Sequence, residues 1–287
     1  MSGATVLMLG AVAYDPKVVT IWNGFRDWFH HHDFALDYVL YSHYERQVED
    51  LLAGHIDAAW NSPLAWVRAR RLAGARGVSL RALAMRDTDR DLSSVIVARA
   101  DSHLRSLDDL RGKVLGVGAV DSPQATLLPL AHLQRNGIEP GRDVIVRRFD
   151  VGIGLHGDHI GGERDAARAL IAGQVDAACM IDSNHLLFSR DGTLPVGATR
   201  VIGQTPLFDH CNLTLAAGVP SPTAERFGEL LFGMSYADPE LRSLFDLEGL
   251  KWWCEGRTSG YVQLESAADT LDFYDAEGRI NARDYRP

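Results

Sequence analysis

The chain has 287 residues, with 29 Lys and Arg against 38 Asp and Glu, so its formal net charge is −9 at pH 7. This length suits one large domain or two of ordinary size, and the acidic balance excludes a broad nucleic-acid surface, which needs clustered Lys and Arg. No sequence run approaches the roughly 20 apolar residues of a membrane-spanning helix, and three widely spaced cysteines exclude a disulfide framework.

The first third of the sequence predicts strands that alternate with helices. Apolar residues recur at helical spacing from Val18 to Phe29, and Gly54 is a typical helix stop. In chain order we expect strand 6–9, helix 18–29, strand 36–40, helix 48–52, strand 56–60, helix 63–72, strand 80–85 and a strand from residue 95. The charged run 86–91 is predicted to be a solvated loop whose charges pair with one another.

The middle of the sequence continues the alternation. We expect a one-turn helix at 106–112, strand 114–117, helix 122–136, strand 144–149, helix 163–172 and strand 175–181. Strands that are regularly separated by helices predict an α/β fold with parallel sheets.

One segment recurs in similar form. Leu-Ala-Gly-His-Ile-Asp-Ala-Ala at 52–59 matches Ile-Ala-Gly-Gln-Val-Asp-Ala-Ala at 171–178, and a polar turn follows each. The repetition predicts two lobes of the same architecture. The alternative is a chance likeness between two common helix–Gly–strand joints.

Two helices are predicted to begin in the same way. Ser62-Pro63 and Ser122-Pro123 each follow a buried strand, and Ser is a preferred N-cap while Pro suits the first helical position. Free N–H groups and the helix dipole make such a start favourable for an anion. The sequence therefore predicts a small anionic or polar ligand held between two lobes.

Four segments resemble those of the type II periplasmic solute-binding proteins, nearest to the phosphate- and phosphonate-binding group of ABC transporters: Gly54–Trp60, Arg86–Val97, Ser106–Val114 and Ala172–Ala178. The resemblance implies a two-lobed α/β fold. Each lobe would be a mostly parallel sheet flanked by helices, and two crossing segments would join the lobes. Residues 1–93 and 206–287 would form lobe 1, and residues 94–205 would form lobe 2.

The resemblance also implies a set of ligand-binding residues. They are Tyr14, His43, Tyr44, Asn61 and Ser62 in lobe 1, and Ser122, Gln124, Ala125 and Thr126 in lobe 2. The second of the recurring turns adds Asp182 and Ser183. The group usually has a hydroxyl-rich run where this chain has Ser-Pro-Gln-Ala-Thr. Because Gln offers both a donor and an acceptor, it suits a larger or less charged ligand than bare phosphate.

A second departure is the Gly-rich loop at 150–160. It contains His156, Asp158 and His159, and Glu163 follows it. Imidazoles and carboxylates this close can bind a divalent metal such as iron or zinc, or move protons. His185 and His210 would add metal ligands if all of these faced one point. We therefore take His156, His159 and Glu163 as catalytic candidates. Direct hydrogen bonds to the ligand, or a position on the surface, are the alternatives for these histidines.

Two functions follow from these observations. The first is a solute-binding protein that closes over a phosphate-like, phosphonate-like or carboxylate-bearing ligand in an interlobe cleft. The second is a cytoplasmic enzyme on the same scaffold, of the lyase, decarboxylase or synthase type, with or without a metal. The expected partners are a small molecule and a second copy in a homodimer. The N-terminus lacks a secretory pattern, which predicts a cytoplasmic protein, or a periplasmic one if a leader has been removed.

Overall fold

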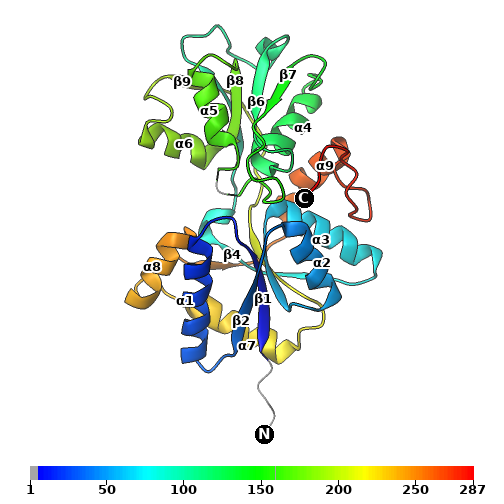
Figure 1. Ribbon diagram of the computed structural model, residues 1–287, viewed down its shortest axis with the longest axis vertical. Helices are drawn as coiled ribbons and strands as arrows, with labels where there is room; N and C mark the ends of the chain where they lie inside the picture. The colour runs from blue at the N-terminus through cyan, green and yellow to red at the C-terminus, as the bar shows by residue number, and fades with distance from the viewer. Residues whose placement is uncertain (1–5, 159) are drawn as a thin grey trace. The chain divides into compact units, whose positions relative to one another are not determined.

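The computed structural model describes residues 6–158 and 160–287, and the chain forms two compact units (Figure 1). The first unit comprises the chain up to Arg90, Asp209–Gly260 and Ala276–Arg279, and the second comprises Asp91–Phe208, Tyr261–Asp275 and Ile280–Pro287. The chain first passes between units at Arg90–Asp91 and returns at Phe208–Asp209. These two segments run antiparallel, because Leu92 pairs with Phe208 and the His210 N–H donates to the Asp89 carbonyl at 2.7 Å.

The first unit is built on a mixed six-stranded sheet of order β11-β4-β10-β3-β1-β2. Its strands are β1 (Leu7–Val12), β2 (Leu36–Tyr41), β3 (Ala58–Asn61), β4 (Arg81–Arg86), β10 (Asn212–Leu215) and β11 (Trp253–Glu255). β1 pairs in parallel with β2 and β3, whereas β10 runs antiparallel to β3 and β4. The helices are α1 (Lys17–His31), α2 (Tyr44–Ala53), α3 (Pro63–Ala75), α7 (Ser221–Gly233) and α8 (Pro239–Glu248), with a 3-10 turn η1 (Asp87–Asp89).

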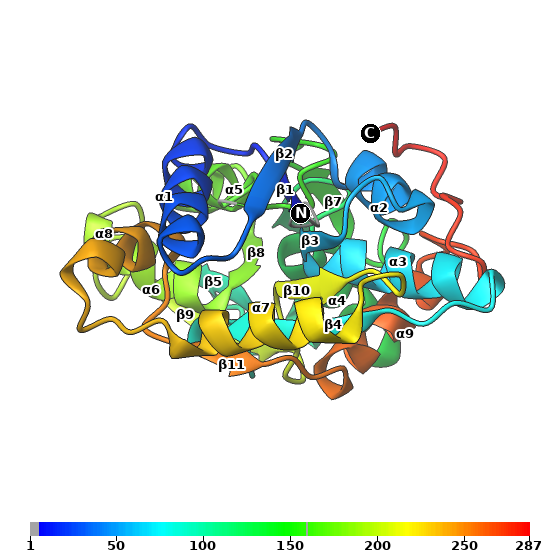
Figure 2. The same ribbon diagram turned by 90° about the horizontal axis from the view of Figure 1, so that it is seen from below.

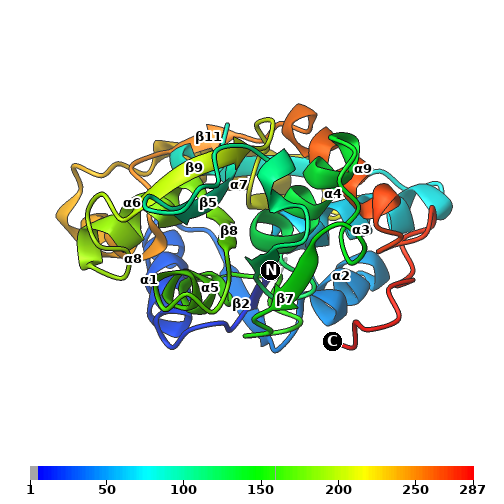
Figure 3. The same ribbon diagram turned by 90° about the horizontal axis from the view of Figure 1, so that it is seen from above.

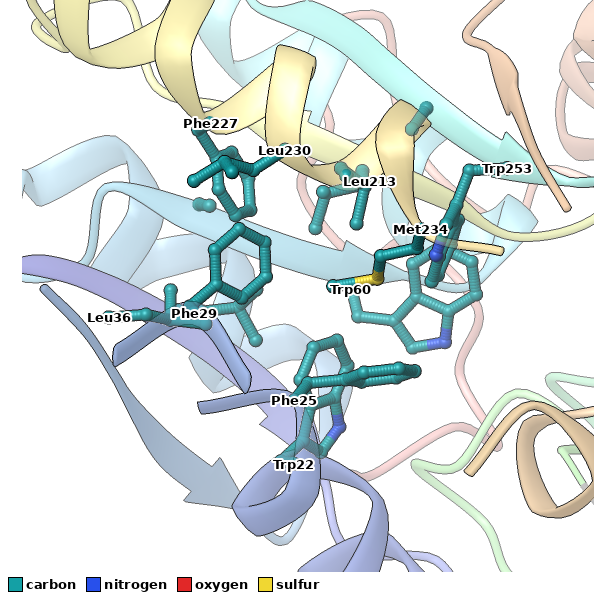
Figure 4. Packing of buried hydrophobic residues seen from close by; sticks show 14 of the residues in the cluster. Trp22, Phe25, Phe29, Leu36, Trp60, Leu213, Phe227, Leu230, Met234 and Trp253 are labelled. Carbon is teal, nitrogen blue, oxygen red and sulfur yellow. The ribbon is translucent and has the colours of Figure 1, made fainter. Parts of the chain in front are cut away.

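An aromatic core packs one face of this sheet against α1, α7 and α8, and α2 and α3 cover the other face (Figure 2). Phe25 lies edge-on to Trp253 at 6.1 Å between ring centroids, and Phe29 lies 5.2 Å from Phe227 (Figure 4). All four of these rings are buried. The helical spacing of apolar residues along 18–29 thus formed the predicted buried face of α1.

The second unit has a mixed five-stranded sheet of order β7-β6-β8-β5-β9. Its strands are β5 (Ser94–Arg99), β6 (Val114–Val117), β7 (Ile145–Arg148), β8 (Ala177–Ile181) and β9 (Thr199–Gln204). Its helices are α4 (Leu128–Arg135), α5 (Glu163–Ile171), α6 (Asp182–Asp191) and α9 (Val262–Thr270), with η2 (Asp108–Leu110) and η3 (Pro123–Leu127); η4 (Ser259–Tyr261) leads into α9. α4 lies on one face of the sheet, and α5 and α6 lie on the other (Figure 3). An apolar cluster of buried residues packs on each face.

The two-unit α/β architecture is confirmed, but the sheets are mixed rather than mostly parallel. β5 and β10 are the first strands after the chain passes between the units, and they run antiparallel to their neighbours. The expected first lobe included all of 206–287. The structure instead groups 261–275 and 280–287 with the second unit, because α9 packs on α4.

The predicted helix 122–136 begins with a π turn instead of a regular α-helix. The Leu127 N–H donates to the Ser122 carbonyl five residues back at 2.9 Å. Pro129 has no N–H to offer the Ala125 carbonyl, which accepts from the Gly118 N–H at 3.2 Å instead. The regular helix α4 therefore starts only at Leu128.

The composition predicts neither a membrane-spanning helix nor a disulfide framework. None of the helices in the described ranges has the length and hydropathy needed to cross a bilayer. The three cysteines form no disulfide within this part of the chain, and Cys179 and Cys211 are buried.

Candidate functional site

In the first unit, the residues that we expected to bind a ligand follow three neighbouring parallel strands. Tyr14 follows β1, His43 and Tyr44 follow β2, and Asn61 and Ser62 stand at the end of β3. Carboxyl ends of adjacent parallel strands meet at one edge of a sheet, where open α/β sheets bind ligands. The structure therefore brings these five residues to one sheet edge.

The start of α3 has the predicted cap. Ser62 accepts a hydrogen bond from the Ala65 N–H at 3.1 Å, and Pro63 occupies the first turn. Asn61 is fully buried beside it, accepting from Gln47 Nε2 and donating to Thr214 Oγ1, each at 2.9 Å. These bonds engage Asn61 in an internal network of neutral amides and hydroxyls.

The other expected residues of this edge differ in exposure. Tyr14 is half-buried against the aromatic core, and His43 is half-buried at the N-cap position of α2. Tyr44 is 1% exposed. Tyr14 and His43 are thus the more accessible side chains of the five.

In the second unit, the expected residues also follow parallel strands. Ser122 comes after β6, the loop 149–162 comes after β7, and Asp182 and Ser183 come directly after β8. Since β7, β6 and β8 are neighbours, these segments share the carboxyl edge of the second sheet.

The helix start at Ser122 has the predicted cap but is not an open seat for an anion. Ser122 Oγ accepts from the Ala125 N–H at 3.2 Å, and both residues are fully buried. Gly157 of the following loop lies against them, and Gln124 Nε2 donates to the Gly157 carbonyl at 3.0 Å. At Gly157 a Cβ would lie 2.4 Å from Ser122 Oγ, so the close approach requires glycine. The loop therefore covers this helix start.

Asp121 holds the loop in place. Its Oδ2 atom accepts from the N–H groups of Gly154 at 2.7 Å and His156 at 3.1 Å. Burial raises the pKa of Asp121, and the charge of His156 and these hydrogen bonds offset only part of the rise. The sequence interpretation missed Asp121, although an acid between a buried strand and an N-cap serine was the available signal.

Glu163 is buried and links three segments. Its Oε1 accepts from Gln124 Nε2 at 3.1 Å, while Oε2 accepts from the Ile181 N–H at 3.0 Å and from Asn184 Nδ2 at 2.9 Å. These bonds fix the start of α5 to the end of β8. The arrangement suits a positioning group better than the catalytic or metal-binding role expected for Glu163.

The histidines of the second unit point to separate partners. His156 is buried with Nε2 3.3 Å from Tyr285 Oη, and His185 Nε2 lies 3.1 Å from Thr199 Oγ1. Burial lowers the pKa of His185, which favours the neutral imidazole. Asp158 is half-buried, and His159 lies outside the described residues.

The expected metal cluster does not form among the described residues. Within those residues, the group of three His, Cys, Asp or Glu ligand atoms close enough to share an ion is Asp89, His210 and Cys211. It does not include His156, Asp158 or His185. His210 is thus the expected metal ligand that the structure places beside other ligand atoms, which belong to Asp89 of η1 and to Cys211 just before β10.

Asp182 and Ser183 differ in their surroundings. Asp182 Oδ2 accepts from Ser93 Oγ at 2.9 Å, which ties the start of α6 to the start of β5. Ser183 is exposed. Asp182 thus supports the sheet edge, whereas Ser183 is accessible from solvent.

Several buried polar atoms at the two edges have no hydrogen-bond partner among the described residues. They are Gln47 Oε1 in the first unit and Asp121 Oδ1, Gln124 Oε1 and Thr126 Oγ1 in the second. Buried polar atoms are nearly always paired with protein, water or a ligand. Sequence reasoning had selected Gln124 and Thr126 but missed Gln47 and Asp121.

Thr126 lines a cavity of about 900 Å³ within the second unit. Its walls come from the start of α4, from β7 and from the C-terminal segment, including Leu127, Arg148 and Phe273. Ser122, Gln124 and Ala125 do not line this cavity. Thr126 therefore faces different surroundings from the rest of the helix start.

Three solved structures share this fold at low sequence identity. PhnD1 from Prochlorococcus marinus, in complex with methylphosphonate, is 16% identical with a TM-score of 0.68, covering 93% of this chain and 98% of its own. A protein from Xanthomonas citri bound to chloride is 18% identical with a TM-score of 0.71, covering 93% and 99%. A binding-protein component of an ABC phosphonate transporter from Pseudomonas aeruginosa is 14% identical with a TM-score of 0.62, covering 96% and 92%.

No curated protein matches this sequence. The family model described as the periplasmic substrate-binding protein of phosphonate ABC transporters matches residues 12–261, which is most of the chain. This match confirms the resemblance seen in the sequence and gives no support to the enzyme alternative. The chain therefore belongs to the family of periplasmic substrate-binding proteins of phosphonate ABC transporters.

Proposed function

We propose that this protein binds a small organic acid of the phosphonate or carboxylate kind in a cleft between its two units and delivers it to an ABC transporter. The first unit would contribute Tyr14, His43, Tyr44, Asn61 and Ser62 from the edge formed by β2, β1 and β3. The second unit would contribute Ser122, Gln124, Ala125, Thr126, Asp182 and Ser183. Closure of the two units over the ligand would give the form that the transporter recognises.

The observation that carries this proposal is the placement of the unpartnered polar atoms. Gln47 Oε1 lies beside the Asn61 network of the first unit, and Gln124 Oε1 lies at the covered helix start of the second. A ligand that supplies hydrogen bonds to these atoms would remove the cost of burying them, about 1–3 kcal/mol for each.

The second unit favours a ligand with hydrogen-bond donors besides its acid group. Because Gly157 O and Glu163 Oε1 are both acceptors, the nitrogen of the Gln124 amide faces them and its oxygen faces away. That oxygen can only accept. Asp121 and Glu163 add buried carboxyl oxygens nearby that accept hydrogen bonds, which also favours a ligand that carries donors over bare phosphate.

Isothermal titration calorimetry tests the proposal. Methylphosphonate, an aminoalkylphosphonate, inorganic phosphate and acetate are the ligands, and we expect the aminoalkylphosphonate, whose amine supplies hydrogen-bond donors, to bind most tightly and phosphate to bind more weakly. In Gln124→Met, which keeps the length of the side chain but removes the amide, the affinity should fall at least about tenfold. Gln174→Met is the matched control, because Gln174 is exposed in the same unit. Failure of every acid to bind would overturn the proposal, as would equal affinity in both variants.

We also propose where in the cell the protein acts and how it assembles. Family membership favours the periplasm, the second of the two locations that the sequence left open. Fractionation of cells that express the natural gene tests this, and recovery of the protein in the cytoplasm would favour the first location. A homodimer stays a prediction, which light scattering of the purified protein can check.

A further inference from the structure

A side-chain cluster in the first unit joins η1 to the start of β10. His210 Nδ1 lies 3.1 Å from Cys211 Sγ and 3.5 Å from Asp89 Oδ1, and the three atoms all lie within 4.8 Å of one another. Asp89 and Cys211 are buried, and His210 is half-buried. The proposed ligand site does not use these residues.

Hydrogen bonds of the backbone and of Arg86 fix the cluster. The His210 N–H donates to the Asp89 carbonyl at 2.7 Å, and the Cys211 N–H donates to Asp89 Oδ1 at 3.2 Å. Arg86 Nη2 and Nε donate hydrogen bonds to the same carboxylate, each at 2.7 Å. The ligand atoms are therefore held in place before any ion arrives, which lowers the cost of binding one.

The charges in and around the cluster favour an added cation. Asp89 forms an ion pair with Arg86, whose Nη2 lies 2.7 Å from Asp89 Oδ1. Glu248 Oε1 also pairs with Arg86, at 3.2 Å, so these two carboxylates and one guanidinium sum to a charge of −1.

We propose that Cys211 Sγ, His210 Nδ1 and Asp89 Oδ1 bind one Zn²⁺, with water in the fourth position. Zn²⁺ favours these three ligand types in tetrahedral geometry, with bonds of about 2.0–2.3 Å, which sets neighbouring ligand atoms roughly 3.3–3.6 Å apart. The observed Nδ1–Oδ1 distance of 3.5 Å matches that spacing, the Nδ1–Sγ distance of 3.1 Å is shorter, and Sγ and Oδ1 lie within 4.8 Å of each other, so binding would need a small shift of the Cys211 side chain. His210 must then carry its proton on Nε2.

Proton and charge both balance on binding. The Zn–S bond replaces the S–H bond of Cys211, and the thiol proton is released to solvent. Two positive charges enter and one negative charge is created at sulfur, so the charge of −1 becomes zero. The ion would fix η1 to the start of β10, next to the two segments through which the chain passes between units.

Titration of the metal-free protein with Co²⁺ and Zn²⁺ tests the site. We expect one Co²⁺ per chain with a thiolate-to-cobalt charge-transfer band, and displacement of that Co²⁺ by Zn²⁺. In Cys211→Ser the band should be lost and the Zn²⁺ affinity should fall more than about tenfold. Cys254→Ser is the matched control, because Cys254 lies outside the cluster and should keep both.

Each result of the Co²⁺ titration either supports or overturns the zinc site. Absence of a charge-transfer band in the unmodified protein would overturn the site, and so would a band that survives Cys211→Ser. If circular dichroism shows that Cys211→Ser does not fold, His210→Gln supplies the same comparison. Because ligand binding is measured separately, loss of the zinc site leaves the proposed transport function untouched.

Discussion

The two units share a local sequence pattern but surround it with different chemistry. In both, a buried parallel strand leads into an N-cap serine followed by proline. In the first unit, Asn61 joins a network of neutral amides and hydroxyls, and the buried acid Asp89 is paired with Arg86. In the second, Asp121 and Glu163 accept hydrogen bonds from backbone and side-chain amides.

This difference determines how each unit responds to pH and to substitution. An ion pair lowers the pKa of Asp89 to about 2, whereas burial raises the pKa of Asp121 above 3.8. The same residue type thus stabilises the first unit when it is ionised and the second unit when it is protonated. The second helix start also depends on a close contact between Ser122 and Gly157.

The largest effect should come from breaking the charge pair of the first unit. Asp89→Asn leaves Arg86, whose side chain is 18% exposed, with one partner fewer, and loss of one member of a buried ion pair costs about 3–5 kcal/mol. Urea unfolding measures the free energy of unfolding. Asp101→Asn is the control, because the Arg99–Asp101 pair is largely exposed and should contribute little. Equal effects in the two variants would remove charge pairing as the distinction between the units.

The next effect tests the covering loop of the second unit. Gly157→Ala places a Cβ 2.4 Å from Ser122 Oγ and should cost about 3 kcal/mol, since neither the cap nor the loop can move freely. Gly192→Ala is matched in backbone conformation, with φ of +81° against +70°, but its Cβ would meet nothing within 4 Å among the described residues. It should cost only the conformational strain of about 1–2 kcal/mol. Similar unfolding midpoints for Gly157→Ala and Gly192→Ala would mean that Gly157 and Ser122 are not in tight contact.

A smaller effect is expected from the amide network of the first unit. Asn61→Leu removes two buried hydrogen bonds and should lower the free energy of unfolding by about 2 kcal/mol. Asn136→Leu removes one exposed hydrogen bond, at 2.8 Å to the His132 carbonyl, and should change it by less than about 0.5 kcal/mol. If Asn61→Leu proves as mild as the exposed change, the network contributes nothing to stability.

The smallest and most specific effect is in the pH dependence. Because the pKa of Asp121 is raised in the folded protein, the folded state binds more protons than the unfolded state above pH 3.8. Stability from this group is therefore lost as pH rises through the raised value. Asp121→Asn should remove that loss, so its free energy of unfolding relative to that of the unmodified protein should be higher at pH 8 than at pH 4. A relative value that falls between pH 4 and pH 8 would contradict the direction.

For Asp89 we predict the opposite dependence of stability on pH. Its stabilisation is present above pH 3.8 and is lost as pH falls towards about 2. Acid unfolding monitored by tryptophan fluorescence should show this loss, because Trp22, Trp60 and Trp253 all lie in the core of the first unit.

Local pattern was enough to predict much of the fold. The spacing of apolar residues located α1, and Ser-Pro after a strand located both helix starts. The four segments that resemble the family identified it correctly, and the family model matches residues 12–261. These features depend on neighbours a few positions apart, which a single sequence displays directly.

The sequence by itself thus determined most of the elements up to residue 181, the family and the sheet edges at which polar residues gather. Only the tertiary structure decided which side chains face one another: Gln124 with Gly157, His156 with Tyr285, and Asp89 with His210 and Cys211. The charged run 86–91 was expected to be solvated, yet Asp89 is buried because β10 and α8 close over it with Arg86. Such contacts join residues far apart in the chain, and burial and charge pairing there depend on packing that no local pattern encodes.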